Sequence, residues 1–181
     1  MARIPYVDDA TIEKATGVKS TINLIRLAFH SPQMGAAFTR LGVAQLTSLA
    51  LNTKLRELLI LQVATFMKSE YEWAQHQAIA RAAGVTDEQI AAIQQGQTES
   101  DLFAEEERAL LRFVSKIAEP TPMPETAFNE AKQYFSNQEL VEIVVLQGFY
   151  YSVAKLTSVF EAEIDPPAGT ELLNMAKAAS A

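Results

Sequence analysis

Residues 53–76 read TKLRELLILQVATFMKSEYEWAQH, and this stretch decides the fold. Within it, residues 55–63 are apolar on nearly every side of a helix, which is typical of a helix at the centre of a protein. Thr53 stands where it can cap the start of that helix. A turn is expected at residues 66–68, so the segment predicts two consecutive helices that fold back on one another.

Acidic side chains and one of only two histidines are gathered in this apolar stretch. Ionisable groups among apolar side chains lose solvation, so their pKa values move toward those that acid–base catalysis uses. Glu72 and His76 are four residues apart and share one helix face, where a carboxylate can orient the imidazole. Glu57 lies twelve residues before Ser69, about 18 Å along a continuous helix. It can therefore join the others only if the chain turns.

Each of these residues also has a structural interpretation. Ser69-x-x-Glu72 matches a capping box, in which the two side chains satisfy backbone amides at a helix start. His76 could be a core histidine bonded to a backbone carbonyl. Glu57 could be a buried acid paired with an arginine across a helix interface. Trp73 is typical of core or interface packing. The sequence leaves both interpretations open.

Apolar residues recur at three- and four-residue spacing along the whole chain, which predicts an all-α protein of about eight or nine helices. Gly84, Thr86-x-x-Gln89 and Ser136-x-x-Glu139 are stop and start signals of helices. The β-branched stretch 141–153 is interpreted as part of a long buried helix that continues to residue 160. Other expected helices cover residues 21–29, 32–49, 104–118, 125–134 and 170–179.

Composition excludes several classes of function. The chain has 181 residues, enough for one domain, and carries a net charge of −7 without any run of its 15 basic residues. Nucleic acid is therefore not an expected partner. Cysteine is absent, which excludes disulfides and thiol redox chemistry. The N-terminus lacks the apolar core of a signal peptide and no apolar run approaches about 20 residues, so a cytoplasmic protein without a membrane anchor is expected.

Metals and cofactors are not expected either. Glu57, Glu72 and His76 form a sparse set of carboxylate and imidazole groups, whereas helical di-metal proteins need more inward acids and paired Glu-x-x-His motifs. The other histidine is His30. No glycine-rich phosphate loop, nucleophile elbow or dinucleotide fingerprint occurs in the sequence.

A short internal similarity links two apolar segments. Residues 57–62 read ELLILQ and residues 142–147 read EIVVLQ. The two could descend from a duplicated helical hairpin, or they could agree by chance because an acid before aliphatic residues is common in buried helices.

At residues 55–93 the chain resembles the carboxymuconolactone decarboxylase and AhpD-like superfamily. In its peroxidase members a glutamate is followed twelve residues later by Cys-x-x-Cys, and a histidine follows four residues after the second cysteine. The corresponding residues here are Glu57, Ser69, Glu72 and His76. Because both cysteines are replaced, the chain is not expected to be a thiol peroxidase.

This resemblance implies one AhpD-like helical domain over residues 1–181, with its core motif in residues 53–96. The cysteine-free decarboxylase branch implies a homo-oligomer, a trimer or hexamer, that acts without cofactor on a small carboxylic acid or lactone. His76 would be its proton-transfer residue.

The resemblance also suggests the remaining roles. Glu57 or Glu72 would orient His76 or relay the proton, and Tyr150 would donate a hydrogen bond to an oxyanion. Ser69, Trp73 and Tyr150 are candidates for the substrate pocket. The leading hypothesis is a cofactor-independent lyase or isomerase acting on a small lactone or carbonyl acid. The alternative is a non-catalytic oligomeric helical protein in which the same residues cap helices and fill an interface.

Overall fold

The computed structural model describes residues 1–17 and 22–166, which form nine α-helices and no strand. The all-α prediction is confirmed, whereas the expected tail helix at residues 170–179 lies outside the described residues. The helices are α1 (Asp9–Thr16), α2 (Asn23–Ala28), α3 (Pro32–Thr47), α4 (Thr53–Met67), α5 (Glu70–Ala82), α6 (Asp87–Gln94), α7 (Glu105–Ala118), α8 (Glu125–Ala131) and α9 (Asn137–Val159).

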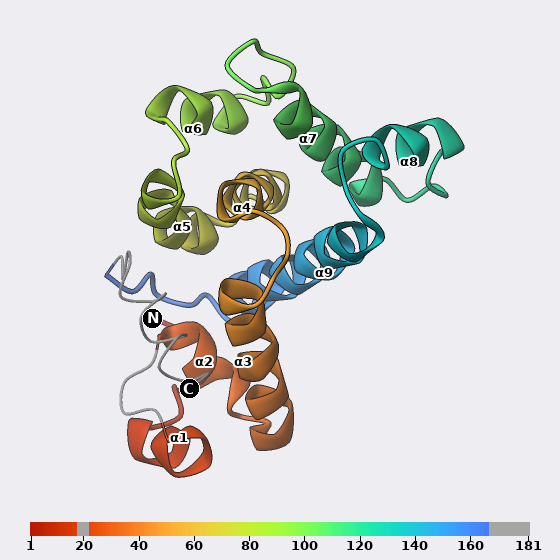
Figure 1. Cartoon of the computed structure of the whole chain (residues 1–181). Coiled ribbons are helices and arrows are strands. Elements are labelled where there is room, and N and C mark those ends of the chain that lie inside the picture. Colours follow the sequence, from red (N-terminus) through yellow and green to blue (C-terminus); the bar gives the residue numbers. More distant parts are fainter. Residues whose placement is uncertain (18–21, 167–181) are drawn as a thin grey trace.

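Helix α4 is the centre of the fold. Figure 1 shows it end-on, with α5, α6, α7 and α9 around it, and it packs against all four. Leu58, Leu59, Ile60, Leu61 and Val63 are completely buried. A helix enclosed on every side needs apolar residues on every side, which explains the continuous apolar run.

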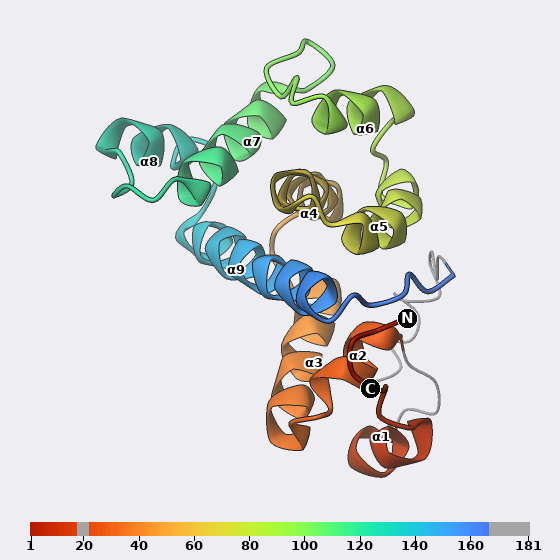
Figure 2. The same ribbon diagram turned by 180° about the vertical axis from the view of Figure 1, so that it is seen from behind.

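Helix α9 is the longest of the nine and runs beneath α4 and α7 (Figure 2). Ser136 and Glu139 form the expected capping box at its start. Among the described residues it is the one helix whose length and composition would allow it to cross a membrane, although 44 % of its most apolar window is buried inside the protein. The core helix of a soluble protein meets the same criterion.

Most helix ends follow the local signals of the sequence, but α3 ends at Thr47 rather than residue 49 and α8 at Ala131 rather than residue 134, and the cap of α4 also differs. Asn52 caps α4 by accepting from the backbone N–H of Lys54 at 2.8 Å, and Thr53 is already the first helical residue. The predicted turn is confirmed, because Lys68 adopts a left-handed conformation with φ 51° and ends α4. Thr86 and Gln89 form the expected capping box of α6.

The two similar segments share one packing role. Gln62 on α4 and Gln147 on α9 are both buried, and each donates its side-chain amide to a carbonyl of α7, at Leu111 and Val114, both at 3.0 Å. A buried amide requires such a partner. A duplication remains a prediction.

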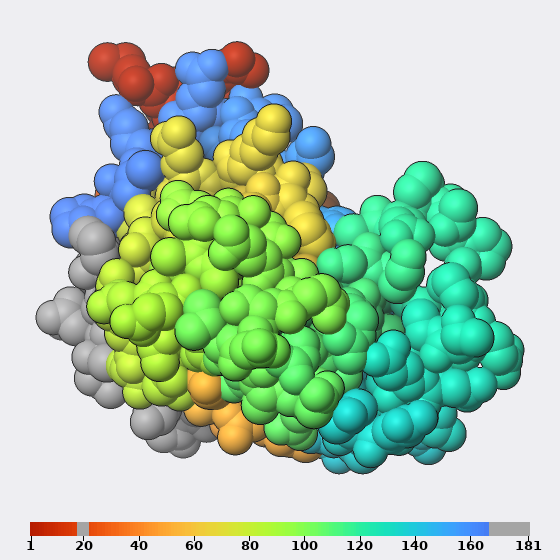
Figure 3. Space-filling model, turned by 90° about the horizontal axis from the view of Figure 1, so that it is seen from above, coloured from red at the N-terminus to blue at the C-terminus, as the bar shows by residue number. Residues whose placement is uncertain are grey.

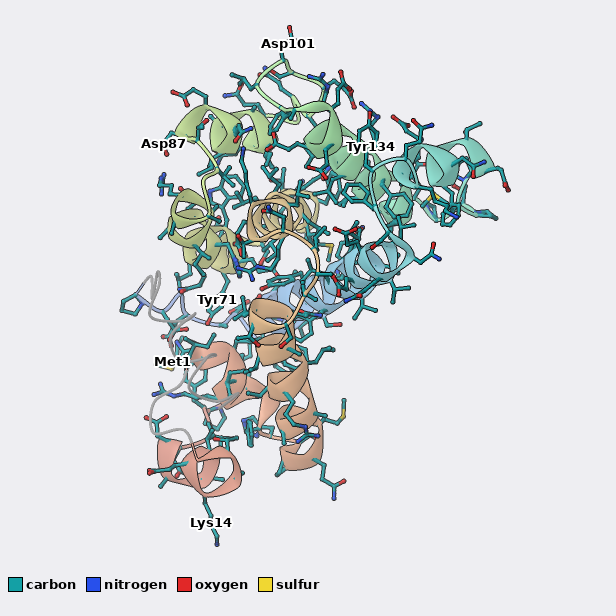
Figure 4. The ribbon with its side chains drawn as sticks, in the orientation of Figure 1. Met1, Lys14, Tyr71, Asp87, Asp101 and Tyr134 are labelled. Atoms are coloured by element: carbon teal, nitrogen blue, oxygen red, sulfur yellow. The ribbon has the colours of Figure 1, made fainter. Side chains whose placement is uncertain are left out.

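The N-terminal segment and the segment after α9 lie together at the left of Figure 1, between α5 and α2. The Arg3 N–H donates to Phe160 at 2.8 Å, and the Tyr6 hydroxyl accepts from the Glu163 N–H at 2.9 Å. The Asp165 carboxylate accepts from the Tyr71 hydroxyl of α5 and from the N–H of Asn23. Figure 4 shows Tyr71 at this boundary between α5 and the lower helices.

From above, the region of α6 and α7 forms a continuous face, and the region of α8 projects to one side (Figure 3). Helix α7 contacts both α8 and α4. The layer that contains α6 and α7 therefore covers one side of α4, while α5 and α9 cover the others.

Replacing Leu59 by alanine is expected to lower the free energy of unfolding by about 2–5 kcal/mol, because it leaves a cavity in the completely buried centre of α4. Urea denaturation of both proteins measures the difference. The control is Leu102→Ala, since this leucine is 48 % exposed. If Leu59→Ala lowers the free energy of unfolding no more than Leu102→Ala does, the central position of α4 is contradicted.

Candidate acid–base site between α4, α5 and α9

Glu57 and His76 come together across the interface of α4 and α5. Glu57 Oε2 lies 2.8 Å from His76 Nδ1, and Glu57 Oε1 accepts from Arg56 Nε at 2.8 Å. Glu57 is completely buried, and Arg56 and His76 are almost so. The turn at Lys68 makes this meeting possible, because it returns α5 along α4.

The surroundings of Glu57 decide where the protons lie. Burial pushes the pKa of Glu57 up, but the charges and hydrogen bonds of His76 and Arg56 outweigh it and hold the pKa below its ordinary value. An ionised carboxylate can only accept, so Nδ1 of His76 carries the proton of their hydrogen bond. In the neutral ring Nε2 is then the acceptor. Within residues 1–17 and 22–166, no group hydrogen-bonds to Nε2.

Glu72 lies one helical turn before His76 and is 1 % exposed. Neither of its carboxyl oxygens has a hydrogen-bond partner in the part of the chain that the structure describes. Burial raises the pKa of Glu72 to about 9, while the nearby Ser69 hydroxyl and Ala154 backbone lower it by less. At pH 7 this side chain is a neutral acid.

The capping box expected at the start of α5 is half formed. The Ser69 hydroxyl accepts from the backbone N–H of Glu72 at 3.4 Å, but the Glu72 carboxyl does not reach back to the cap. Position 72 is buried on the helix face that it shares with His76, so its carboxyl lies inside the protein. It is Glu57, and not Glu72, that hydrogen-bonds to the imidazole.

Tyr150 of α9 packs against the site from a third helix, besides α4 and α5. Its ring meets that of His76 edge to face, with centroids 5.1 Å apart and an interplanar angle of 84°. Burial, and then the charges of Glu57 and Glu72, raise the pKa of Tyr150 well above its usual value, so the phenol keeps its proton. Trp73, in contrast, is half-buried and packs against the hydrophobic core.

Sequence reasoning missed Arg56 as a member of this site. It expected an arginine from across a helix interface, whereas the partner of Glu57 is its own neighbour in the chain. The signal was present, because a charged residue in an otherwise apolar and buried helix needs a partner. Arg56 also donates to the carbonyl of Leu46, in the last turn of α3, at 2.9 Å.

The site does not offer the ligand set of a metal ion. In the described ranges, no group of three or more His, Asp or Glu side chains is arranged to hold one. Glu57 already shares its two oxygens between Arg56 and His76.

Ser69→Ala is expected to lower the free energy of unfolding by about 1 kcal/mol, because it removes the N-cap of α5 and leaves the site residues in place. Thermal unfolding of the variant and wild type gives the difference. A change in the protonation of Glu72, followed by the infrared carboxyl band of the variant, would contradict a purely capping role.

The model of the carboxymuconolactone decarboxylase family matches residues 32–116, which include the whole Glu57–His76 site. Over these residues the chain, which contains no cysteine, is similar to the carboxymuconolactone decarboxylase family. A comparison with curated protein sequences finds no match.

Several solved structures share the fold of this chain. An uncharacterised peroxidase-related protein with an AhpD core from Ralstonia eutropha JMP134 is 16 % identical, with a TM-score of 0.73 over 97 % of this chain and 96 % of its own. An AhpD-like protein of unknown function from Agrobacterium tumefaciens is 24 % identical, with a TM-score of 0.69 over 76 % and 94 % of the two chains. The debrominase Bmp8, in complex with 2,3,4-tribromopyrrole, is 20 % identical, with a TM-score of 0.65 over 91 % and 88 %. At these identities the likeness establishes the fold alone.

Proposed function

We propose that this protein is a cofactor-independent lyase or isomerase that transfers protons on a small lactone or carbonyl acid. One observation carries the proposal: the imidazole of His76, hydrogen-bonded through Nδ1 to Glu57, lies on the same buried helix face as the unpartnered carboxyl of Glu72. Nε2 of a neutral imidazole can accept a proton, and the protonated carboxyl of Glu72 can give one.

The non-catalytic alternative explains part of the site and leaves Glu72 without a role. It accounts for Ser69 as a helix cap and for Trp73 as packing. A buried carboxyl without a hydrogen-bond partner lowers stability, however. Groups with strongly shifted pKa values are concentrated at functional sites, which favours a role for Glu72 in chemistry.

For a decarboxylation, the bond between the substrate carbon and its carboxylate breaks and CO₂ leaves. The electron pair remains on that carbon and is delocalised into a conjugated carbonyl. Glu72 then gives its proton to carbon, the Tyr150 phenol donates a hydrogen bond to the carbonyl oxygen, and Glu72 regains a proton from water. In this scheme Glu72, rather than His76, holds the transferred proton before the substrate binds.

For an isomerisation, His76 acts first, as the base. Its Nε2 removes a proton from the carbon beside the carbonyl, Glu57 stabilises the imidazolium that forms, and Glu72 supplies a proton at a second carbon. A proton moves from His76 back to Glu72 to close the cycle. Both reactions use the proton of Glu72, which is why the proposal covers lyases and isomerases.

Self-association and location belong to the same proposal. Val141, Val144 and Val145 on α9 are 63 %, 47 % and 44 % exposed, and such an apolar face supports a homo-oligomer, a trimer or hexamer. A cytoplasmic location is proposed with it. The debrominase complex supports a ring-sized ligand for a protein of this fold.

The proposal is tested by incubating the wild-type protein in D₂O with carboxymuconolactone and a panel of related β-keto and lactone acids. Release of CO₂, or transfer of deuterium to a defined carbon without CO₂ release, is the expected result for the lyase or the isomerase. A protein that is folded but inert toward the whole panel in both assays would support the non-catalytic alternative.

A further inference from the structure

Gln45, near the end of α3, is a buried amide without a hydrogen-bond partner. The residue is 3 % exposed, and neither its Oε1 nor its Nε2 bonds to any part of the chain that the structure describes. An amide that is buried without hydrogen bonds destabilises a protein. A polar group of a bound ligand is one partner that would remove this cost.

Two other buried glutamines show which interaction Gln45 lacks. Gln62 and Gln147 each donate Nε2 to a backbone carbonyl of α7 at 3.0 Å, while the Oε1 of each is unpaired. The fold therefore tolerates an unpaired Oε1 but supplies an acceptor for Nε2. Within the described residues, Gln45 shares a complete lack of partners for its buried polar atoms only with Glu72, the candidate proton donor.

Gln45 lies on the face of α3 that meets α9 beside the candidate site. Gly42, one helical turn earlier, lies against the ring of Phe149, which a Cβ at this glycine would meet at 3.1 Å. Phe38, a further turn back, stacks on the same ring with centroids 4.4 Å apart. Phe149 in turn meets Tyr150 edge to face, with centroids 5.5 Å apart. One aromatic ring therefore joins this face of α3 to the tyrosine of the site.

The charges at this end of α3 indicate what kind of group Gln45 can bind. The carbonyl of Leu46, the next residue, accepts from Arg56 at 2.9 Å. The positive charge of Arg56 is paired with Glu57 at 2.8 Å. An amide carries no charge, and a buried ion without an opposite charge is costly. Gln45 is therefore suited to an uncharged acceptor, such as a carbonyl oxygen.

We propose that Gln45 is a specificity residue of the site, and that its Nε2 donates a hydrogen bond to the ring carbonyl oxygen of a lactone. This inference rests on the proposed function for the class of compound, and it narrows that class to acids with a ring carbonyl. Before the ligand binds, Nε2 has no acceptor. Binding then supplies the interaction that Gln62 and Gln147 obtain from α7.

Binding is measured with γ-carboxy-γ-butyrolactone, a lactone acid whose saturated ring lacks the conjugation that decarboxylation requires. Cyclopentanecarboxylate, which has the same ring size and carboxylate but no ring carbonyl, is the control compound. The side-chain amide signal of Gln45 is followed in ¹H–¹⁵N spectra at pH 7; it is assigned from the backbone resonances and is absent in Gln45→Met. In wild type this signal is expected to shift with the lactone acid and to stay in place with cyclopentanecarboxylate.

Gln45→Met keeps the length of the side chain and removes its hydrogen-bonding groups. The variant is expected to bind the lactone acid about 5–10-fold more weakly and to lose a similar factor in kcat/KM on a lactone that wild type turns over. It is expected to unfold at the same urea concentration as wild type or at a higher one, because no hydrogen bond of the folded protein is lost.

Gln62→Met is the matched control, because it also replaces a buried glutamine. It removes the hydrogen bonds to Leu111 and Ser115, so it is expected to unfold at a lower urea concentration and to keep the wild-type affinity for the lactone acid. A purely structural role for Gln45 predicts the opposite pattern in Gln45→Met: lower stability and unchanged affinity.

A Gln45 signal that does not move with the lactone acid would overturn the inference, and so would a folded Gln45→Met that binds as tightly as wild type. A wild type that does not bind the lactone acid, or that binds cyclopentanecarboxylate equally well, would also overturn it. If Gln45→Met does not fold, the wild-type spectra still decide.

Binding of the saturated lactone acid requires no turnover, so the inference and the proposed function can fail separately. A protein that binds it through Gln45 but is inert toward the whole substrate panel would keep the inference and lose the proposed function. Turnover of a lactone with an unmoved Gln45 signal would give the reverse result.

Discussion

His76→Gln is expected to lower kcat by about 10²–10⁴-fold on a substrate that the wild type isomerises, because it removes the nitrogen that takes the proton from carbon. A glutamine amide can still donate a hydrogen bond to Glu57, so the buried carboxylate keeps a partner. Steady-state kinetics, with elution volume and circular dichroism as checks of assembly and fold, measure the effect.

The matched control for this variant is His30→Gln. His30 is the other histidine, it is exposed, and its ring contacts the Pro5 carbonyl at 2.7 Å, away from α4 and α5. It is expected to retain wild-type turnover. Equal losses in the two variants, or a His76 variant that is folded and fully active, would remove His76 from the chemistry.

Glu72→Gln is expected to stabilise the protein at neutral and alkaline pH while it reduces turnover. The folded-state pKa of Glu72 is raised to about 9 from an ordinary value of 4.5. Between these values the folded protein binds one more proton than the unfolded chain, so the free energy of unfolding falls as pH rises, by about 1.4 kcal/mol per unit. The stabilisation that protonated Glu72 contributes is complete below pH 4.5 and lost progressively up to about pH 9.

Glutamine has a similar shape to glutamate and does not ionise. The fall in the free energy of unfolding with rising pH that Glu72 causes therefore disappears in the variant. Near pH 7 the variant is expected to be more stable than wild type by about 3 kcal/mol, and the difference vanishes toward pH 4.5. Urea denaturation of both proteins across this range measures it. Glu70→Gln, at an exposed position two residues earlier on α5, serves as the control and is expected to follow the wild-type slope. Parallel wild-type and Glu72→Gln curves would show that Glu72 is ionised in the folded protein.

The sequence by itself determined the helices and the spacing of the site. Residues 55–63 are apolar on nearly every side, and such a helix is stable only when others enclose it. Capping boxes at Thr86 and Ser136 are local interactions between residues three apart, so the printed sequence contains both partners. Glu57 and His76 are 19 residues apart with a turn between them, and this spacing brought both to one interface.

The tertiary structure decided the chemistry of each group. In the sequence, Glu72 is an ordinary glutamate at the third position of a helix. Only its burial between α5 and the neighbouring helices makes it a neutral acid. The choice of Glu57 as the partner of the imidazole, the part of Arg56 and the edge-on ring of Tyr150 follow from how α4, α5 and α9 pack. Desolvation and charge pairing depend on neighbours that are distant in the chain. Spacing can therefore predict which residues meet, while their protonation states follow only from the packed structure.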